Sequence, residues 1–369
     1  MIPVNTPLLD GNERKYLNEC IDTGWISSEG PFIKRFEDAV AVISSRKYAV
    51  AVSSGSAALD CAVLALDLPK GSEVIAPTFT IISCIASIVR AGCKPVLVDS
   101  DADTWNMDVT SIEKKITGNT SAIMVVHIYG LPVDMEPIIA LAKKYNLKII
   151  EDAAEQHGQF YNSQAIGSFG EVSIFSFYPN KHITTGEGGM IVTDNEAIAE
   201  RCRSLRNLCF IPAKRFYHEE LGFNYRMTNL QAALGVAQIE QFNRFIERKR
   251  SIGKYYQDQL SSIKSLQLPV PHLSFAENIY WVFGMVINDE SNMNALEAMQ
   301  ALQADGIGTR PFFYPMHLQP VFNKMGLFLD DHFPVAERLA ERGFYIPSGL
   351  ALTRQQQDTV ITTLHKYFQ

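Results

Sequence analysis

The stretch that decides the fold runs from Ser173 to Met190 and reads S-I-F-S-F-Y-P-N-K-H-I-T-T-G-E-G-G-M. It begins with the apolar pattern of a buried strand, which ends at Pro179, and a second apolar run follows a glycine-rich turn. Lys181 lies on the turn between the two runs. A lysine there is either an ordinary surface charge or a chemically special group. The rest of the chain has to decide between these two interpretations.

The residues around this stretch alternate between strand and helix patterns. Such alternation predicts crossover connections and a mostly parallel sheet with helices on both faces, the α/β class. The near-continuous apolar character of the strands agrees with burial on both faces. The predicted strands span residues 48–52, 74–77, 95–99, 122–127, 148–152, 172–177 and 190–193, and helices lie between the first five at 57–66, 80–91, 109–116 and 135–145.

The pattern changes after the last of these strands. An irregular stretch reaches residue 227, and a long helical pattern over 229–260 leads to a segment with fewer strands. The length of 369 residues favours about two domains. We therefore predict a large domain over 1–250 and a smaller C-terminal α+β domain over 251–369. Further helices are predicted at 13–23, 32–43, 196–205, 294–304, 334–342 and 354–368, with a strand at 280–287.

Composition narrows the range of partners. The net charge of −7 provides no basic excess for nucleic acid or for an anionic membrane surface. The longest uncharged run, residues 76–89, is too short and too polar to span a bilayer. The six cysteines are scattered without a C-x-x-C pair, and the first residues lack the pattern of a secretory signal. These features predict reduced cysteines and a cytoplasmic protein.

Two polar motifs follow predicted strands, at the edge of a parallel sheet where ligands bind. S-S-G-S-A-A-L, residues 53–59, passes from strand to helix through Gly55, and Ser56 adds a hydroxyl donor. Backbone N–H groups at such a helix start suit a phosphate, although a plain N-cap would give the same pattern. E-D-A-A-E-Q-H-G begins at the end of another strand, where Asp152 can hold a protonated ring nitrogen or cap a helix.

Lys181 completes a set of three groups. A lysine in an apolar site can lose its proton at neutral pH and react with an aldehyde. A phosphate cradle, a carboxylate for a ring nitrogen and such a lysine match the three handles of pyridoxal 5′-phosphate (PLP). The chain has no nucleotide-binding glycine motif, no G-x-S-x-G and no H-E-x-x-H. Nucleotide hydrolysis, dinucleotide redox chemistry, serine hydrolysis and a metal site therefore lose support.

These residues carry a resemblance to a known family. The run F-S-F-Y-P-N-K-H-I-T-T-G-E-G-G-M, with E-D-A-A-E upstream and G-F-N-Y-R-M-T-N-L-Q-A-A-L-G downstream, resembles the DegT/DnrJ/EryC1/StrS family of nucleotide-sugar aminotransferases. The resemblance covers nearly the whole chain and implies the aspartate aminotransferase fold, fold type I, with PLP as cofactor. I-P-V-N-T-P-L-L, W-I-S-S-E-G-P and R-P-F-F-Y-P-M-H are most similar to members that act on GDP-linked 4-keto-6-deoxyhexoses.

The resemblance also implies roles for individual residues. Lys181 and Asp152 would be catalytic, as the covalent anchor of PLP and the partner of its ring nitrogen, with Glu155 near the ring. Asn224 would reach the cofactor phosphate of a neighbouring subunit, which implies a homodimer with shared active sites. The implied phosphate contacts are Gly55, Ser56 and Ser176, and the implied contacts of the nucleotide-linked sugar are Trp25, Tyr314 and His317.

Three departures from the family pattern leave the reaction open. Ile81 stands where many relatives have an aromatic ring, so its contact with the cofactor would be van der Waals. Pro179 and His182 instead resemble a related sugar 3-dehydratase that has histidine at the lysine position. Retention of Lys181 favours transfer of an amino group from L-glutamate to the 4-keto carbon. The alternatives are a PLP-dependent 3-dehydratase, a UDP- or dTDP-linked substrate, and a protein that binds PLP without turnover.

Overall fold

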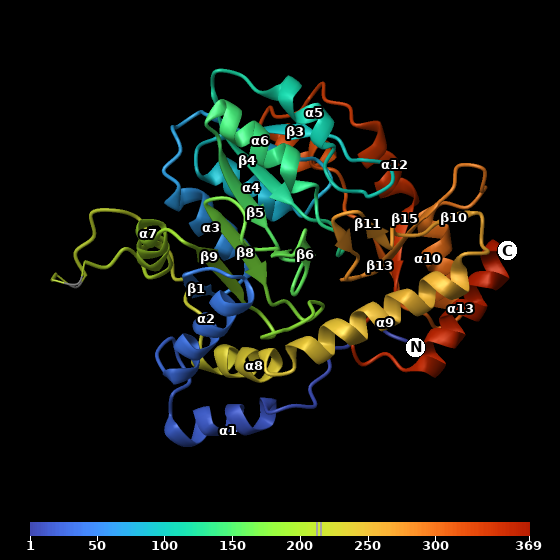
Figure 1. Cartoon of the computed structure of the whole chain (residues 1–369), viewed down its shortest axis with the longest axis horizontal. Helices are drawn as coiled ribbons and strands as arrows, with labels where there is room; N and C mark the ends of the chain where they lie inside the picture. The colour runs from blue at the N-terminus through green and yellow to red at the C-terminus, as the bar shows by residue number, and fades with distance from the viewer. Residues whose placement is uncertain (212, 215) are drawn as a thin grey trace.

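The computed structural model describes residues 1–211, 213–214 and 216–369, and its largest element is a seven-stranded sheet (Figure 1). β9 is antiparallel to both of its neighbours, and the remaining pairs are parallel, so the predicted mostly parallel α/β fold is confirmed. In spatial order the strands are β1 (Tyr48–Val52), β9 (Gly189–Thr193), β8 (Val172–Ser176), β5 (Lys148–Asp152), β4 (Thr120–Val126), β2 (Glu73–Pro77) and β3 (Lys94–Val98).

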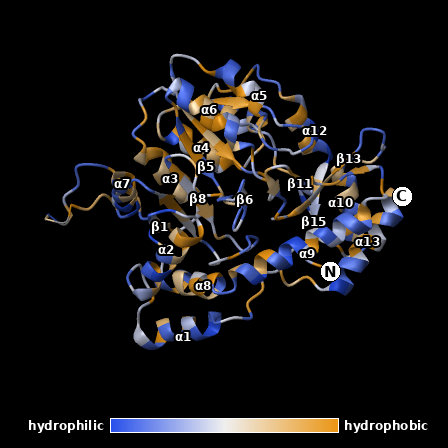
Figure 2. Cartoon of the chain, in the orientation of Figure 1, coloured by the Kyte–Doolittle hydropathy of each residue, from blue (hydrophilic) through white to orange (hydrophobic). Residues whose placement is uncertain are grey.

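Both faces of this sheet are covered by helices. Successive residues of a strand point to opposite sides, so its apolar side chains contribute to a core on each face. Val50 and Val52 belong to one apolar core, whereas Ala49 and Ala51 belong to another. Figure 2 shows the central strands as strongly hydrophobic. The first core includes residues of α3 (Gly55–Ala65), α4 (Ile82–Arg90) and α7 (Glu196–Arg206), and the second includes residues of α1 (Glu13–Thr23), α2 (Pro31–Ile43), α6 (Met135–Tyr145) and α8 (Asn229–Ile239).

A second, antiparallel sheet of four strands forms from the later part of the chain. Its order is β10 (Leu266–Gln267), β13 (Phe283–Ile287), β15 (Gly343–Ile346) and β14 (Arg310–Pro311). The sequence predicted only the strand that became β13, because the others are too short to show a periodic pattern. A third apolar core joins this sheet to α9 (Phe242–Leu260), α10 (Ala295–Ala304) and α13 (Arg354–Phe368).

The smaller elements are connectors. The region expected as one helix over 109–116 is α5 (Val109–Ile112) followed by the 3-10 turn η1 (Glu113–Lys115). None of the described helices is both long enough and apolar enough to cross a membrane. The remaining elements are β6 (Phe160–Tyr161), β7 (Gln164–Ala165), β11 (His272–Leu273), β12 (Ala276–Glu277), η2 (Met316–Leu318), α11 (Pro320–Lys324) and α12 (Pro334–Arg342).

The long helix predicted over 229–260 is two helices. α8 ends at Ile239 and α9 begins at Phe242. Glu240, between them, accepts hydrogen bonds from Tyr16 in α1 and from Asn12, which precedes that helix, so the break is tied to α1. α9 then runs from beneath the large sheet to the second sheet (Figure 1). The predicted boundary at residue 250 therefore falls inside α9, and the division into 1–250 and 251–369 stays a prediction.

The two sheets meet at a close backbone contact. Gly130, just beyond β4, has a φ of +99° and accepts hydrogen bonds from the Ile279 N–H at 3.0 Å and from the side chain of Gln159 at 2.9 Å. A Cβ atom on Gly130 would lie 2.6 Å from the Tyr280 nitrogen and 2.7 Å from the Trp281 nitrogen. Glycine is required here both for its conformation and for this approach.

Replacement of this glycine tests how much the junction contributes to stability. Gly130→Ala should lower the free energy of unfolding by about 2–4 kcal/mol, because the new methyl group collides with backbone that cannot move freely. Gly71→Ala is a matched control, because Gly71 has a φ of +76° but an added Cβ would meet nothing within 4 Å. The control should cost about 1 kcal/mol from backbone strain alone. Urea unfolding measures the free energy of unfolding of both variants. An equal decrease in the two would contradict the importance of the contact at Gly130.

Candidate active site

A cavity of about 340 Å³ lies at the carboxyl ends of the parallel strands. In open α/β sheets this edge is the usual place for ligands. The structure brings together in its lining seven of the eight predicted cofactor residues, from four separate parts of the chain. They are Gly55, Ser56, Ile81, Asp152, Glu155, Ser176 and Lys181.

One end of the cavity is built to receive an anion. Gly55 is the first residue of α3, and Ser54 caps the helix by accepting a hydrogen bond from the Ala57 N–H at 3.1 Å. A Cβ atom on Gly55 would lie only 2.9 Å from the Cβ of Ser176, so glycine lets β8 approach the helix start. The hydroxyl of Ser56 lies 2.6 Å from that of Ser83. Free backbone N–H groups, the helix dipole and these hydroxyls together suit a phosphate.

Asp152 lies deeper in the cavity, at the end of β5. Its side chain is buried, and burial raises its pKa, while the Ala154 N–H, Cys84 and Lys181 act in the opposite direction. One carboxylate oxygen accepts the Ala154 N–H at 3.0 Å, and the Cys84 thiol donates to the other at 3.2 Å. The carboxylate is therefore held in one orientation and can bind a protonated ring nitrogen.

Lys181 lies on the turn between β8 and β9 with only 9% of its side chain exposed. Its Nζ is 3.8 Å from Glu155 Oε1 and 3.5 Å from the centroid of the Trp281 ring. Burial lowers the pKa of Lys181, because the charged form loses solvation, and the carboxylates of Glu155 and Asp152 partly offset this effect. The amine is thus closer to its reactive neutral form than a surface lysine is.

Glu155 is the nearest acidic partner of that lysine. Burial raises its pKa to about 8, although Lys181 and the Tyr129 N–H, which donates to Oε2 at 2.7 Å, favour the charged form. A lysine with a lowered pKa beside a carboxyl with a raised pKa can exchange a proton near neutral pH. Ile81, 44% exposed, borders the cavity at the start of α4, where its side chain can offer only van der Waals contact.

Four predicted residues lie outside this cavity. Trp25, Tyr314 and Asn224 are exposed, so their predicted contacts stay predictions. His317 is buried, and its two ring nitrogens bond Thr78 at 2.8 Å and Glu337 at 3.0 Å. Both nitrogens are thus used inside the chain, where they join the segment after β2 to α12, and the predicted contact of His317 with a nucleotide-linked sugar stays a prediction.

Sequence reasoning missed three residues that shape the site. Trp281 covers Lys181, Cys84 orients Asp152, and the Tyr129 N–H binds Glu155. Trp281 comes from the approach to β13 in the second sheet, so no local pattern links it to the lysine. Cys84, in the first turn of α4, gave no chemical signal either, because buried cysteines are common in protein cores.

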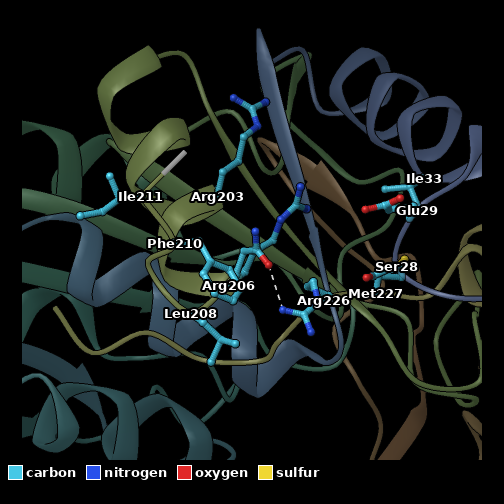
Figure 3. A pocket seen from close by; sticks show the side chains of 11 residues that line it. Ser28, Glu29, Ile33, Arg203, Arg206, Leu208, Phe210, Ile211, Arg226 and Met227 are labelled. Atoms are coloured by element: carbon cyan, nitrogen blue, oxygen red, sulfur yellow. Dashed lines mark hydrogen bonds between the residues drawn. The ribbon is translucent and has the colours of Figure 1, made fainter. Parts of the chain in front are cut away.

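A second cavity, of about 650 Å³, opens near the end of α7 (Figure 3). It is polar and carries the guanidinium groups of Arg203, Arg206 and Arg226. Arg226 donates to Asn207 at 2.8 Å, and Arg206 donates to Glu37 at 2.8 Å. The backbone of Asn207 also forms a bridge with Asn224, which places that predicted residue beside this cavity rather than in the cavity of Lys181.

Comparison with known proteins now identifies the family. A model described as the DegT/DnrJ/EryC1/StrS aminotransferase family matches residues 7–365. The chain belongs to this family. GDP-perosamine synthase from Escherichia coli O157:H7 is 41% identical over 367 residues, which cover 100% of this chain and 98% of that protein. The aminotransferase from Psychrobacter cryohalolentis has a TM-score of 0.92 at 27% identity and covers 98% of both chains.

A third similar protein was solved with the cofactor PLP bound. Escherichia coli GDP-4-keto-6-deoxy-D-mannose-3-dehydratase, solved with bound hydrated PLP, has a TM-score of 0.90 at 25% identity and covers 99% of both chains. The predicted class, a PLP-dependent aminotransferase, is confirmed by family membership. The residues of this chain fit that cofactor, because a cradle that a Cβ on Gly55 would fill, a buried carboxylate and a buried lysine line one cavity.

The pair formed by Lys181 and Glu155 yields a testable pH dependence. Glu155→Gln should lower the pKa of Lys181, because it removes the carboxylate that most strongly opposes the effect of burial. More neutral amine is then present at a given pH, so the apoprotein should react with added PLP at lower pH than the wild type. The appearance of the visible absorption band, followed against pH, measures this reaction.

Glu187→Gln is the matched control, since Glu187 lines the same cavity and forms no ion pair with Lys181 among the described residues. This variant should leave the pH profile in place. A profile for Glu155→Gln that is unchanged or moves to higher pH would contradict the pairing.

Proposed function

We propose that this aminotransferase moves an amino group from L-glutamate to the 4-keto carbon of a nucleotide-linked 4-keto-6-deoxyhexose. The substrate we favour is GDP-4-keto-6-deoxymannose, which would give GDP-perosamine for surface polysaccharide such as O-antigen. The observation that carries the proposal is the likeness over the whole chain to GDP-perosamine synthase, together with a buried lysine in the cavity. UDP- and dTDP-linked keto sugars are the competing substrates.

The side chains divide the work in this proposal. When bound, PLP supplies an aldehyde carbon that can carry an amino group and a ring that accepts an electron pair. Gly55, Ser56 and Ser176 would hold its phosphate, and Asp152 would keep a proton on its ring nitrogen. Lys181 would anchor the cofactor and would take and return a proton at Nζ as general base and acid.

Glu155 and Trp281 assist the lysine. Glu155 stabilises the ammonium form of Lys181 at 3.8 Å and can accept a proton near neutral pH. The Trp281 ring covers Nζ and excludes water from that side. Proton transfer by Lys181 then competes less with exchange to solvent.

The dehydratase alternative loses its motivation in the structure. His182 is buried, lies 3.5 Å from the Ile279 carbonyl oxygen, and does not line the cavity of Lys181. Pro179 also lies outside that lining, and its carbonyl oxygen accepts a hydrogen bond from Asn5 at 2.9 Å. Pro179 and His182, the two residues that resemble the dehydratase, therefore lie outside the cavity, whereas Lys181 lines it.

Substitution of the lysine tests the reaction. Lys181→Ala should lower the rate of amino transfer by at least about 10³-fold, because the covalent anchor and the proton carrier are lost together. The assay supplies L-glutamate and a panel of GDP-, UDP- and dTDP-linked keto sugars, and reads the products by mass. A product that gains an amine supports the proposal, and a product that has lost a hydroxyl as water would overturn it in favour of dehydration.

We further propose that the enzyme is a cytoplasmic homodimer with shared active sites. Asn224 is exposed and lies beside the arginine-lined cavity, outside the cavity of its own Lys181. Exposed apolar side chains at Trp25, Ile26 and Leu221 offer surface for a second copy. The six cysteines are free and buried, which suits a reducing compartment.

Complementation distinguishes shared from separate sites. Asn224→Asp should weaken PLP binding in the partner's site, because a second negative charge would face the phosphate. Mixing inactive Lys181→Ala with inactive Asn224→Asp, under conditions that let subunits exchange, should restore about a quarter of wild-type activity, because half of the dimers are hybrids with one intact site each. If the mixture stays inactive while hybrids form by mass, the two residues do not share a site.

A further inference from the structure

Lys249 is a buried lysine that the proposed reaction does not use. It lies in the middle of α9 and is only 3% exposed. Its ammonium group donates to the carbonyl oxygen of Trp281 at 2.8 Å and to that of Ser348 at 2.6 Å. Among the described residues no carboxylate contributes to its electrostatic environment, and burial alone lowers its pKa to about 7.

Burying a lysine side chain costs free energy, so its N–H donors must serve a purpose that an apolar side chain could not. A buried ammonium ion loses its hydration, and a methionine of similar length would fill the same space without this cost. The two carbonyl oxygens that Lys249 binds belong to segments far apart in the sequence, one before β13 and one after β15. Phe283, at the start of β13, pairs with Ile346, at the end of β15, so the two segments lie at the same end of the second sheet. Lys249 therefore fastens this end of the sheet to α9.

Trp281 connects this fastening to the active site. Its indole N–H donates to the carbonyl oxygen of Asn180 at 2.9 Å, beside Lys181. Its ring face lies 3.5 Å from Lys181 Nζ, measured to the ring centroid. Lys249 of α9 thus binds the backbone carbonyl of Trp281, and the turn that carries Lys181 binds its indole ring through Asn180. A change at either end should move the ring relative to the reacting amine.

We propose that Lys249 is a positioning residue that, through the backbone of Trp281, sets the indole ring against Lys181. The inference rests on the proposed role of Lys181 as the anchor of PLP. It assigns a function to the contact between α9 and the second sheet that goes beyond holding the fold together. Lys249 itself does not line the cavity of Lys181.

The structure offers a matched control for a purely structural role. Tyr256 is also buried in α9, and its hydroxyl donates to the carbonyl oxygen of Pro347 at 2.8 Å, one residue before Ser348. Tyr256→Phe removes one hydrogen bond between the same helix and the same segment but leaves Trp281 untouched. It should lower stability without altering the cofactor site.

The test measures PLP binding by apoprotein from the visible absorption band, together with the pH at which that band changes. Lys249→Met should raise the Kd for PLP by about 10-fold and shift this pH, whereas Tyr256→Phe should change the Kd by less than about 2-fold. In a Trp281→Leu background, Lys249→Met should add less than about 2-fold. This coupling is the signature of action through Trp281.

Other outcomes overturn the proposal. An unchanged Kd in Lys249→Met, or the same factor in both backgrounds, would show that Lys249 does not act through Trp281. If Lys249→Met does not fold, Lys249→Gln, which is neutral and can still bond one carbonyl, must show the same coupling with a smaller factor. A visible band that persists in Lys181→Ala would instead refute the proposed anchor, whatever Lys249 does.

Discussion

The rest of the site depends on the partial burial of one ammonium group between two carboxylates and an aromatic ring. Burial favours the neutral form of Lys181, whereas Glu155 and Asp152 favour the charged form. Because these effects oppose each other in a medium of low polarity, small displacements of the neighbours change the proton affinity of the amine strongly. The fold therefore has to fix the lysine turn from several sides, with β8 and β9 on one side and Trp281 on the other.

Much of this arrangement could be predicted from the sequence because the main groups follow strands. Asp152, Gly55 and Lys181 each stand next to a short apolar run, and parallel strands bring their carboxyl ends to one edge. The structure places all three in the lining of one cavity. Prediction failed where a contact joins separate layers. Trp281 reaches the lysine from the second sheet, and nothing in the residues beside it announces that approach.

The same limit explains His317 and the break before α9. R-P-F-F-Y-P-M-H gives no sign of the hydrogen bonds that occupy the ring nitrogens of His317, because the partners Thr78 and Glu337 lie far away in the sequence. The helical pattern over 229–260 shows no Gly or Pro at its interruption, and the residue at the break, Glu240, accepts hydrogen bonds from Asn12 and Tyr16, which are distant in sequence. The local sequence pattern predicts the helices and strands. Tertiary contacts decide where these elements end and which of their side chains are exposed.

The position of β9 has a consequence for how the enzyme assembles. β9 begins at Gly189, whose Cα is so close to the start of α3 that an added Cβ would lie 2.3 Å from the carbonyl oxygen of Ser54, the N-cap of that helix. β9 also pairs with β8, so one strand joins the helix start at Gly55 to the end of β8. β1 and β9 are distant in sequence, and such pairings form late because closing a long loop costs entropy. Competence to bind a phosphate during refolding would therefore report the closure of the whole sheet.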